Sequence, residues 1–284
     1  MRVTAMLMVV IYHSLCIYGI WSDSPFTVVS YMGWAKFLNS IDMPIFFFLS
    51  GYLYAYKLSD ADSYMCNYSF FKKKFKRLMC PYLFWGILII LLFPDRYKFT
   101  TMAVGISHLW FLLALMMIFV IVHVLRHFWM KPPIVYKFGI IILLIIVQPY
   151  IINYCPPILA LPQALSFLPI FLIGTLCSKH KFPSLPSYSY RIILTVILIS
   201  MTIVLLYICF VYDNHVGQYT LVANFVFRIC PIVIILISWI LCKDVYFKEF
   251  CFVNSLDCNS MGIYIIHHIL IIALIQSSLA FEFK

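Results

Sequence analysis

Long apolar runs recur along the whole chain, and they limit its fold more than any other feature. Residues 138–147, FGIIILLIIV, are apolar throughout and show none of the alternation of a barrel strand. Hydrophobic residues make up 64% of the sequence and charged residues 11%, too little charge for a soluble domain of this length. The sequence therefore predicts an all-α, polytopic bundle of transmembrane helices in a lipid bilayer.

The apolar runs predict nine membrane spans, with bounds good to a few residues. They cover 3–21, 42–57, 79–94, 107–125, 137–153, 161–178, 191–212, 220–242 and 259–280. Residues 26–38, FTVVSYMGWAKFL, are amphipathic and predict a tenth, re-entrant or surface helix. No loop is long enough for a soluble domain, so we expect residues 1–284 to form one integral membrane domain.

The first apolar run is long for a signal peptide, and no A-x-A-like cleavage site follows it. We therefore expect a retained first span. Because this span begins next to Met1, the sequence is compatible with a natural start a few residues upstream.

The net charge of +10 has a topological explanation. The basic residues lie in short loops between spans, which argues against nucleic acid as a partner. If the N-terminus is cytoplasmic, that side holds fifteen of the twenty basic residues and the other side four, while Arg228 falls inside a span. This bias predicts a cytoplasmic N-terminus and a C-terminus on the opposite side.

Metal and disulfide chemistry are poorly supported. The ten cysteines contain no C-x-x-C pair and mostly lie within apolar runs. His123 and His127, four residues apart, could form a metal pair, but no third ligand is evident. We therefore predict no metal.

Arg2 and His13 are the first candidate site residues. Eleven residues of helix rise about 16 Å, so Arg2 is expected near the cytoplasmic face and His13 near the midplane, on the same helix face. One interpretation is structural, with Arg2 reaching the interface and His13 bonding a neighbouring helix. The other is functional, because an ionisable residue buried in a span is costly; histidine then suits a general base, and it could also carry a covalent group.

A basic cluster precedes the third predicted span in FFKKKFKRLMCPYLFW, residues 70–85, where five of the six residues 72–77 are basic. Membrane topology and anionic lipid explain most such clusters. A polyphosphate site is the sharper alternative, since Lys74 and Arg77 are one helical turn apart.

Three other spans carry weaker signals. Ser50 and Gly51 within MPIFFFLSGYLYA favour close helix packing. In SHLWFLLAL, His108 is either an exposed loop residue or part of a site. In SMGIYIIHHIL, Tyr264 and His267 share a face and either bridge helices or contribute to a site.

Arg228, in NFVFRICPI, is a buried charge that needs a partner, and the sequence does not identify one.

Six motifs occur in order: Arg, ten residues and His in the first span; FFFLSGY; K-x-x-R ahead of LMCPYLFW; HLWFL; FLIGTL; and GIYIIH. This order resembles the acyltransferase family 3 of bacterial integral membrane proteins, which includes O-acetyltransferases of surface polysaccharides. MPIFFFLSGY is similar to the fucose 4-O-acetylase-like branch. The resemblance runs from Arg2 to about Leu270.

The resemblance implies an enzyme of the bacterial inner membrane that takes an acyl group, usually acetyl, from acyl-CoA. It implies delivery to a hydroxyl or amine of a sugar or lipid-linked glycan in the cell envelope, with acyl-CoA as co-substrate and no resident cofactor. It also implies that Arg2 and His13 are functional and that Lys74 and Arg77 correspond to a basic pair R-x-x-R.

Two positions depart from the family pattern. Lys74 keeps a charge but lacks the bidentate fork of arginine, and Asp42 stands where the related branch commonly has histidine.

Physical reasoning and resemblance lead to one set of expectations. The phosphates of CoA need cations, which Lys74, Arg77 and Arg2 would supply, and His13 would deprotonate the acceptor hydroxyl. Tyr264 or His267 would stabilise the oxyanion or orient the sugar; His108 and Arg228 are further candidates for substrate contact. A non-enzymatic glycan or lipid transporter is the main alternative, and a structural membrane subunit is a third.

Overall fold

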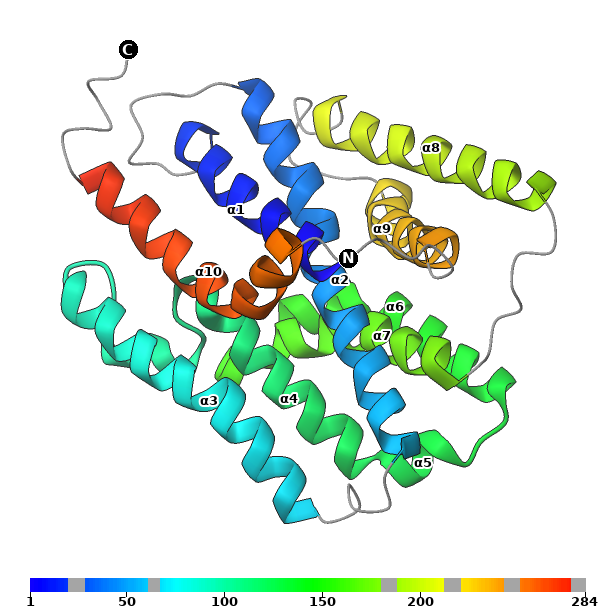
Figure 1. Ribbon diagram of the computed structural model, residues 1–284, viewed down its shortest axis with the longest axis horizontal. Helices are drawn as coiled ribbons and strands as arrows, with labels where there is room; N and C mark the ends of the chain where they lie inside the picture. Colours follow the sequence, from blue (N-terminus) through cyan, green and yellow to red (C-terminus); the bar gives the residue numbers. More distant parts are fainter. Residues whose placement is uncertain (20–28, 61–66, 180–187, 212–220, 243–250, 277–284) are drawn as a thin grey trace. The chain divides into compact units, whose positions relative to one another are not determined.

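A computed structural model describes residues 1–19, 29–60, 67–179, 188–211, 221–242 and 251–276. Within these ranges the regular structure is entirely helical, which confirms the predicted fold class (Figure 1). The α-helices are α1 (Arg2–Gly19), α2 (Val29–Asp60), α3 (Asn67–Leu92), α4 (Trp110–Val124), α5 (Arg126–Met130), α6 (Ile134–Tyr154), α7 (Leu161–Lys179), α8 (Tyr188–Val211), α9 (Leu221–Cys242) and α10 (Cys251–Gln276). Short 3₁₀ helices cover Phe99–Ala103 (η2), Ser107–Leu109 (η3) and Ile158–Ala160 (η4).

Over its described residues, each predicted span falls mainly on a different α-helix; residues 20–21, 212, 220 and 277–280 of these spans lie outside the described residues. Within the described residues, five helical segments are long and apolar enough to cross a membrane. These segments are Tyr68–Leu92, Phe99–Val124, Ile158–Ser178, Tyr188–Phe210 and Phe225–Cys242. Helix α8 exposes an apolar surface that includes Ile193, Val196, Ile199 and Ile203, as expected of a helix that faces lipid. The chain is therefore a multi-pass membrane protein.

The extent of α2 corrects the prediction of a separate helix at residues 26–38. Residues 26–28 lie outside the described residues, and residues 29–38 are not a helix of their own, because α2 runs without interruption from Val29 to Asp60. Its 32 residues rise about 48 Å, more than the roughly 30 Å of hydrocarbon. Residues 29–38 are thus the first part of the helix that also contains the second predicted span.

Helix α3 begins at Asn67, twelve residues before the predicted span, and ends at Leu92. The basic cluster at residues 72–77 is therefore helical. Its members point in several directions around the helix, because successive residues are about 100° apart.

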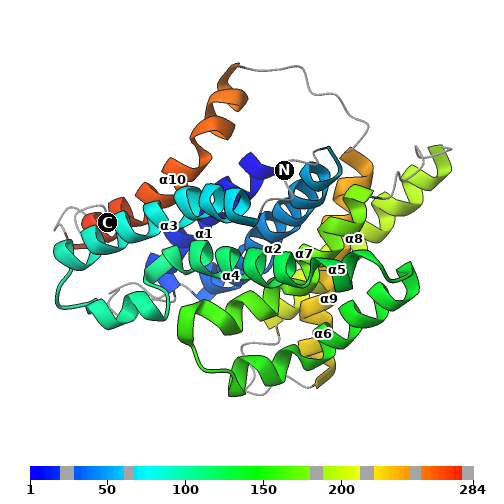
Figure 2. The ribbon, with the colours of Figure 1, turned by 90° about the horizontal axis from the view of Figure 1, so that it is seen from below.

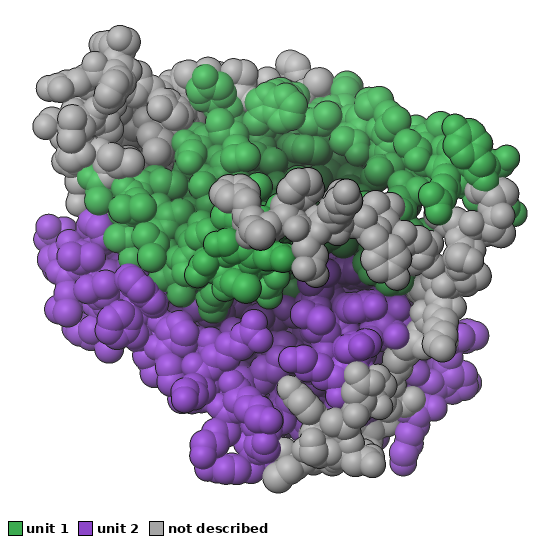
Figure 3. All heavy atoms as spheres, viewed as in Figure 1, with its two compact units in different colours: residues 1–46, 182–284 green, residues 47–181 purple. Residues whose placement is uncertain are grey.

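The chain divides into two compact units (Figure 3). Unit 1 comprises Met1–Phe46 and Phe182–Lys284, and unit 2 comprises Phe47–Lys181. In unit 1, α1 lies beside α10 and α8 lies beside α9 (Figure 1).

Unit 2 has an aromatic core around α4. Helix α4 packs against α3 and α7, and α6 packs against α7 (Figure 2). The Phe47 ring stacks on Phe167 with centroids 4.5 Å apart, and it meets Phe111 edge to face at 5.0 Å. Phe47 and Phe111 are buried and Phe167 is half-buried, and such ring contacts contribute strongly to packing.

Two glycines allow α2 and α7 to approach closely within unit 2. A Cβ added to Gly51 would collide with the carbonyl oxygen of Phe171, and one added to Gly174 would collide with the carbonyl of Phe48. Both obstacles are backbone atoms, which cannot turn aside as a side chain can. The predicted packing role of the Ser50-Gly51 step is thereby confirmed for Gly51.

Candidate functional site

An ion pair joins Arg2 in the first turn of α1 to Asp257 in the second turn of α10. The Arg2 guanidinium donates from Nε to Asp257 Oδ1 over 2.6 Å and from Nη2 to the Asp257 carbonyl over 2.7 Å. Nη2 also contacts Asp257 Oδ2, which makes the pair bidentate. This pairing gives Arg2 a partner that the sequence did not reveal, and its predicted contact with acyl-CoA stays a prediction.

A second link joins the same helices three turns later. Nε2 of His267 lies 3.2 Å from Nδ1 of His13. Arg2 and His13 both face α10, which confirms that they share one face of α1. Because Arg2 meets Asp257 and His13 meets His267, the two helices run in the same direction.

The acceptors around the two rings determine where their protons lie. Nδ1 of His13 is 2.9 Å from the Val9 carbonyl, and Nδ1 of His267 is 3.0 Å from the Ile263 carbonyl. A carbonyl only accepts hydrogen bonds, so each Nδ1 carries the hydrogen. In the neutral rings each Nε2 then holds a lone pair, and Nε2 of His267 is a second acceptor for the His13 N–H. The basic nitrogen of His13 is therefore Nε2.

Aromatic rings surround His13, whose side chain is only 8% exposed. His268 meets it edge to face with centroids 4.9 Å apart, and the Tyr12 ring lies at 4.7 Å. Tyr264 is also buried and lies 5.8 Å from the His267 ring. Tyr264 and His267 thus share a face of α10, as predicted, and His267 bridges to α1.

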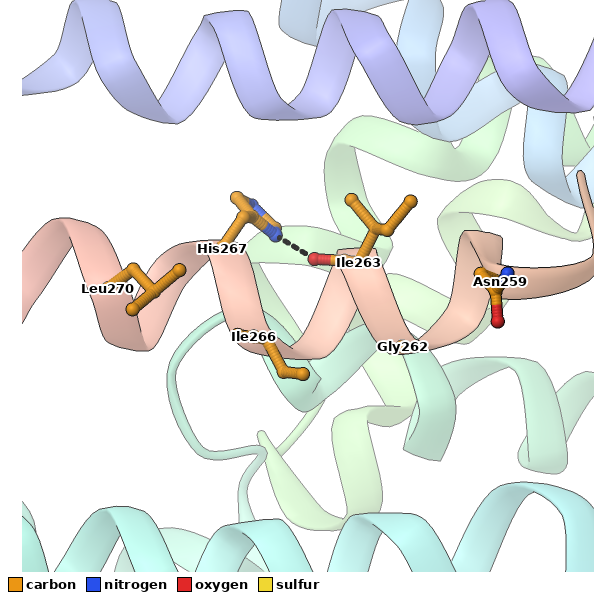
Figure 4. A pocket seen from close by; sticks show the side chains of 6 residues that line it. All are labelled: Asn259, Gly262, Ile263, Ile266, His267 and Leu270. Carbon is orange, nitrogen blue, oxygen red and sulfur yellow. Dashed lines mark hydrogen bonds between the residues drawn. The ribbon is translucent and has the colours of Figure 1, made fainter. Parts of the chain in front are cut away.

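A pocket of 350 Å³ runs along α10 in unit 1 (Figure 4). Its described lining is Asn259, Gly262, Ile263, Ile266, His267 and Leu270. His267 thus both lines a pocket and contacts His13. A small ligand held there would be separated from the His13 ring by the His267 side chain.

The predicted acyl-CoA cations Lys74 and Arg77 lie on α3 in unit 2. The Lys74 ammonium sits 3.7 Å from the centroid of the Phe119 ring and 5.7 Å from that of Phe70. Arg77 is exposed, and Lys57 adds a third interacting positive charge. Cation–π contacts hold Lys74 in place beside these charges.

His108 and Arg228 are the remaining candidates for contact with the substrate. His108 is 3% exposed, so the interpretation as an exposed loop residue is wrong: η3 folds it into unit 2. Arg228 lies on α9, where its Nη1 is buried and has no hydrogen-bond partner among the described residues.

His123, one of the two histidines considered as a metal pair, bonds to an arginine side chain. Nε2 of His123 lies 2.7 Å from Nη1 of Arg126, and a guanidinium only donates, so this nitrogen accepts a hydrogen bond. The side chain of His127 is outside the described residues. In the part of the chain that the structure describes, no three His, Cys, Asp or Glu side chains are grouped to hold a metal ion.

Sequence reasoning missed two members of the α1–α10 contact, Asp257 and His268. Asp257 had a usable signal, because it precedes His267 by ten residues and so nearly matches the spacing of Arg2 and His13 on α1. His268 was visible as the second histidine of the pair, but neighbouring residues on a helix point about 100° apart.

Fold and site together define a multi-pass membrane protein with a buried histidine contact between its first and last helices. A family model described as "Acyltransferase domain" matches residues 1–283. The chain therefore belongs to acyltransferase family 3 and is a membrane acyltransferase. Comparisons with the curated proteins and with the solved structures find no significant match.

Proposed function

We propose that this protein transfers an acetyl group from acetyl-CoA to a hydroxyl of a sugar in a cell-surface or lipid-linked glycan, at the inner membrane of a bacterium. The observation that carries the proposal is the anchored ring of His13. Its Nδ1–H is bonded to the Val9 carbonyl, which leaves Nε2 as the basic nitrogen in a buried site.

The reaction uses that nitrogen first as a base and then as an acid. The acceptor hydroxyl gives its proton to Nε2 of His13 while its oxygen attacks the thioester carbonyl of acetyl-CoA. The tetrahedral intermediate collapses with cleavage of the C–S bond, and the CoA sulfur takes the proton from Nε2. The acetyl ester and free CoA are the products, and His13 returns to its neutral form.

His267 acts on His13 as a positioning residue. The imidazolium that forms during transfer keeps its Nδ1–H directed at two acceptors, the Val9 carbonyl and Nε2 of His267. Both present partial negative charge to a ring that becomes positive, so they stabilise the transition state. The burial of the site limits hydrolysis of the thioester by water.

Lys74 and Arg77 bind the phosphates of CoA in this proposal, because they are one turn apart on α3 and carry positive charge. Arg2 is already engaged by Asp257, so it reaches a phosphate only by leaving that carboxylate. Tyr264, His108 and Arg228 stay candidates for contact with the acceptor or the oxyanion.

The test measures turnover of labelled acetyl-CoA by the full chain in nanodiscs. CoA release and label on the protein are followed for wild type, His13→Ala and Ser14→Ala. Ser14 is the matched control, since its hydroxyl bonds to the Val10 carbonyl within the same helix. We expect His13→Ala to lose about 10²–10⁴-fold of the activity, the usual contribution of a general base.

The outcomes separate the alternatives. Ser14→Ala should retain wild-type turnover, and label trapped on wild type but not on His13→Ala would mean that Nε2 carries the acetyl group covalently. Normal transfer by a folded His13→Ala variant would refute the assignment. A folded protein that neither binds nor turns over acetyl-CoA would favour the transporter.

A further inference from the structure

Asp42 is a buried polar residue of unit 1 that the proposed mechanism leaves without a role. It lies on α2 and is 0% exposed. Its Oδ1 accepts a hydrogen bond from the backbone N–H of Met43 over 2.5 Å. Its Oδ2 is buried and has no hydrogen-bond partner among the described residues. Burying a carboxyl oxygen in this way is costly, so the site is incomplete as it stands.

The surroundings of Asp42 connect it to the histidine contact. Its carboxyl group interacts electrostatically with Tyr12 and Cys16 on α1 and with Tyr264 on α10. Tyr12 is the ring neighbour of His13, and Tyr264 is the ring neighbour of His267. Asp42 is therefore one side chain away from the histidine contact along two routes.

The ring of Phe46, one turn after Asp42 on α2, lies 6.4 Å from that of Tyr264. The Asp42 carboxyl group is thus close enough to Tyr12 and Tyr264 to interact with both, and the Phe46 ring adjoins that of Tyr264. Ligand sites combine apolar and aromatic walls with a few fixed polar groups that orient the ligand. A carboxylate oxygen among aromatic rings suits a ligand with hydroxyl groups and apolar C–H faces, which a sugar has.

We propose that Asp42 is a specificity-determining residue whose Oδ2 accepts a hydrogen bond from a hydroxyl of the sugar acceptor. This inference rests on the proposed function, because it takes the sugar from there. The bound acceptor supplies the hydrogen-bond donor that the described residues lack. The same contact orients the sugar with respect to His13.

Two substitutions separate this role from other possibilities. Asp42→Ala removes both oxygens. Asp42→Asn keeps an oxygen for the Met43 N–H and replaces Oδ2 by an NH₂ group, which can donate to a hydroxyl oxygen but repels an ammonium group. If the ligand group is a hydroxyl, we therefore expect Asp42→Asn to retain partial binding. If it is an amine, we expect Asp42→Asn to lose binding.

Ser40→Ala is the matched control on the same helix. The Ser40 hydroxyl bonds to the Phe37 carbonyl of α2, so its loss removes a polar group two residues away without changing the Asp42 carboxyl.

The experiment uses the full chain in nanodiscs and measures binding without turnover. The probes are the methyl glycosides of glucose, galactose, fucose, rhamnose and glucosamine, and the readout is the rise in melting temperature with glycoside concentration. Acetyl-CoA binding is measured in parallel on every variant.

We expect at least one neutral glycoside to stabilise wild type and Ser40→Ala equally. Asp42→Ala should bind it at least about tenfold more weakly, Asp42→Asn should fall between, and acetyl-CoA binding should be unchanged in all.

Three glycoside-binding results would overturn the proposal: equal affinity in wild type and Asp42→Ala, no stabilisation of wild type by any glycoside, or preferential binding of the glucosaminide that Asp42→Asn abolishes. These results do not depend on acetyl-CoA turnover, so they are distinct from failure of the proposed function. A lower melting temperature of Asp42→Asn without ligand, with acetyl-CoA and glycoside binding weakened together, would show that the carboxyl is structural and would also overturn it.

Discussion

The Arg2–Asp257 pair allows a sharp test of what an arginine at the start of α1 does. If its main role is to hold α1 against α10, then Arg2→Gln and Asp257→Asn remove the same interaction. Each should have the same effect, and the double variant should be no worse than either single one. If Arg2 instead binds a phosphate of acetyl-CoA, the two substitutions should differ.

The expected magnitude is small because both side chains reach solvent. Arg2 is 34% exposed and Asp257 43% exposed, so screening removes most of the Coulomb attraction. The bidentate geometry places the pair at the upper end of the range for exposed pairs, about 1 kcal/mol. For a chain of this size, about 1 kcal/mol corresponds to a fall in melting temperature of about 2 °C.

The assay is a double-mutant cycle on the full chain in nanodiscs, with melting temperature and the KM for acetyl-CoA measured for all four proteins. We expect equal losses of about 2 °C for both single variants, no further loss in the double variant, and one common KM. A KM that rises in Arg2→Gln alone, while Asp257→Asn stays at or below the wild-type value, would refute this reasoning and assign Arg2 to the phosphates.

Two further predictions concern unit 2. Gly51→Ala should lower the melting temperature by several degrees, because the new methyl group collides with the Phe171 carbonyl and overpacking costs about 1–3 kcal/mol. The control Gly139→Ala should raise the melting temperature slightly, because nothing lies within 4 Å of the new Cβ. Equal effects of the two substitutions would contradict the packing argument. Replacing both Lys74 and Arg77 by glutamine should weaken acetyl-CoA binding about tenfold at low salt and less at high salt, relative to a Lys131→Gln control. An unchanged Kd for acetyl-CoA at low salt would show that these two residues do not bind it.

The parts of the fold that were predictable from sequence are those governed by local composition. Apolar runs located the helices, since a membrane helix must satisfy its backbone hydrogen bonds internally and present apolar side chains to lipid. The shared face of Arg2 and His13 followed from helical periodicity alone. The helical continuity of α2 was missed because Asn39, Ser40 and Asp42 interrupt the apolar pattern without breaking the helix.

The contacts that define the candidate site were not predictable in the same way. Asp257 is 255 residues from Arg2 in sequence, and its ten-residue spacing to His267 resembles that of Arg2 to His13 but does not by itself show that the two residues meet. The sequence around His108 is compatible with an exposed loop, and the residue is buried because of how η3 folds. A pairing between distant helices depends on which helices are neighbours, and hydropathy carries no information about that.

The direction of α1 and α10 has a consequence for the topology of the chain. If each predicted span crosses the membrane once, the first and the last run in the same direction only when their number is odd. The order of the Arg2–Asp257 and His13–His267 contacts shows that they do run in the same direction. Nine spans, with residues 29–38 incorporated in α2, satisfy this condition, and a separate tenth crossing would not. Arg2 and Asp257 must then lie near one face of the membrane, so an assay that locates Arg2 also locates Asp257 and sets the depth of His13 between the two faces.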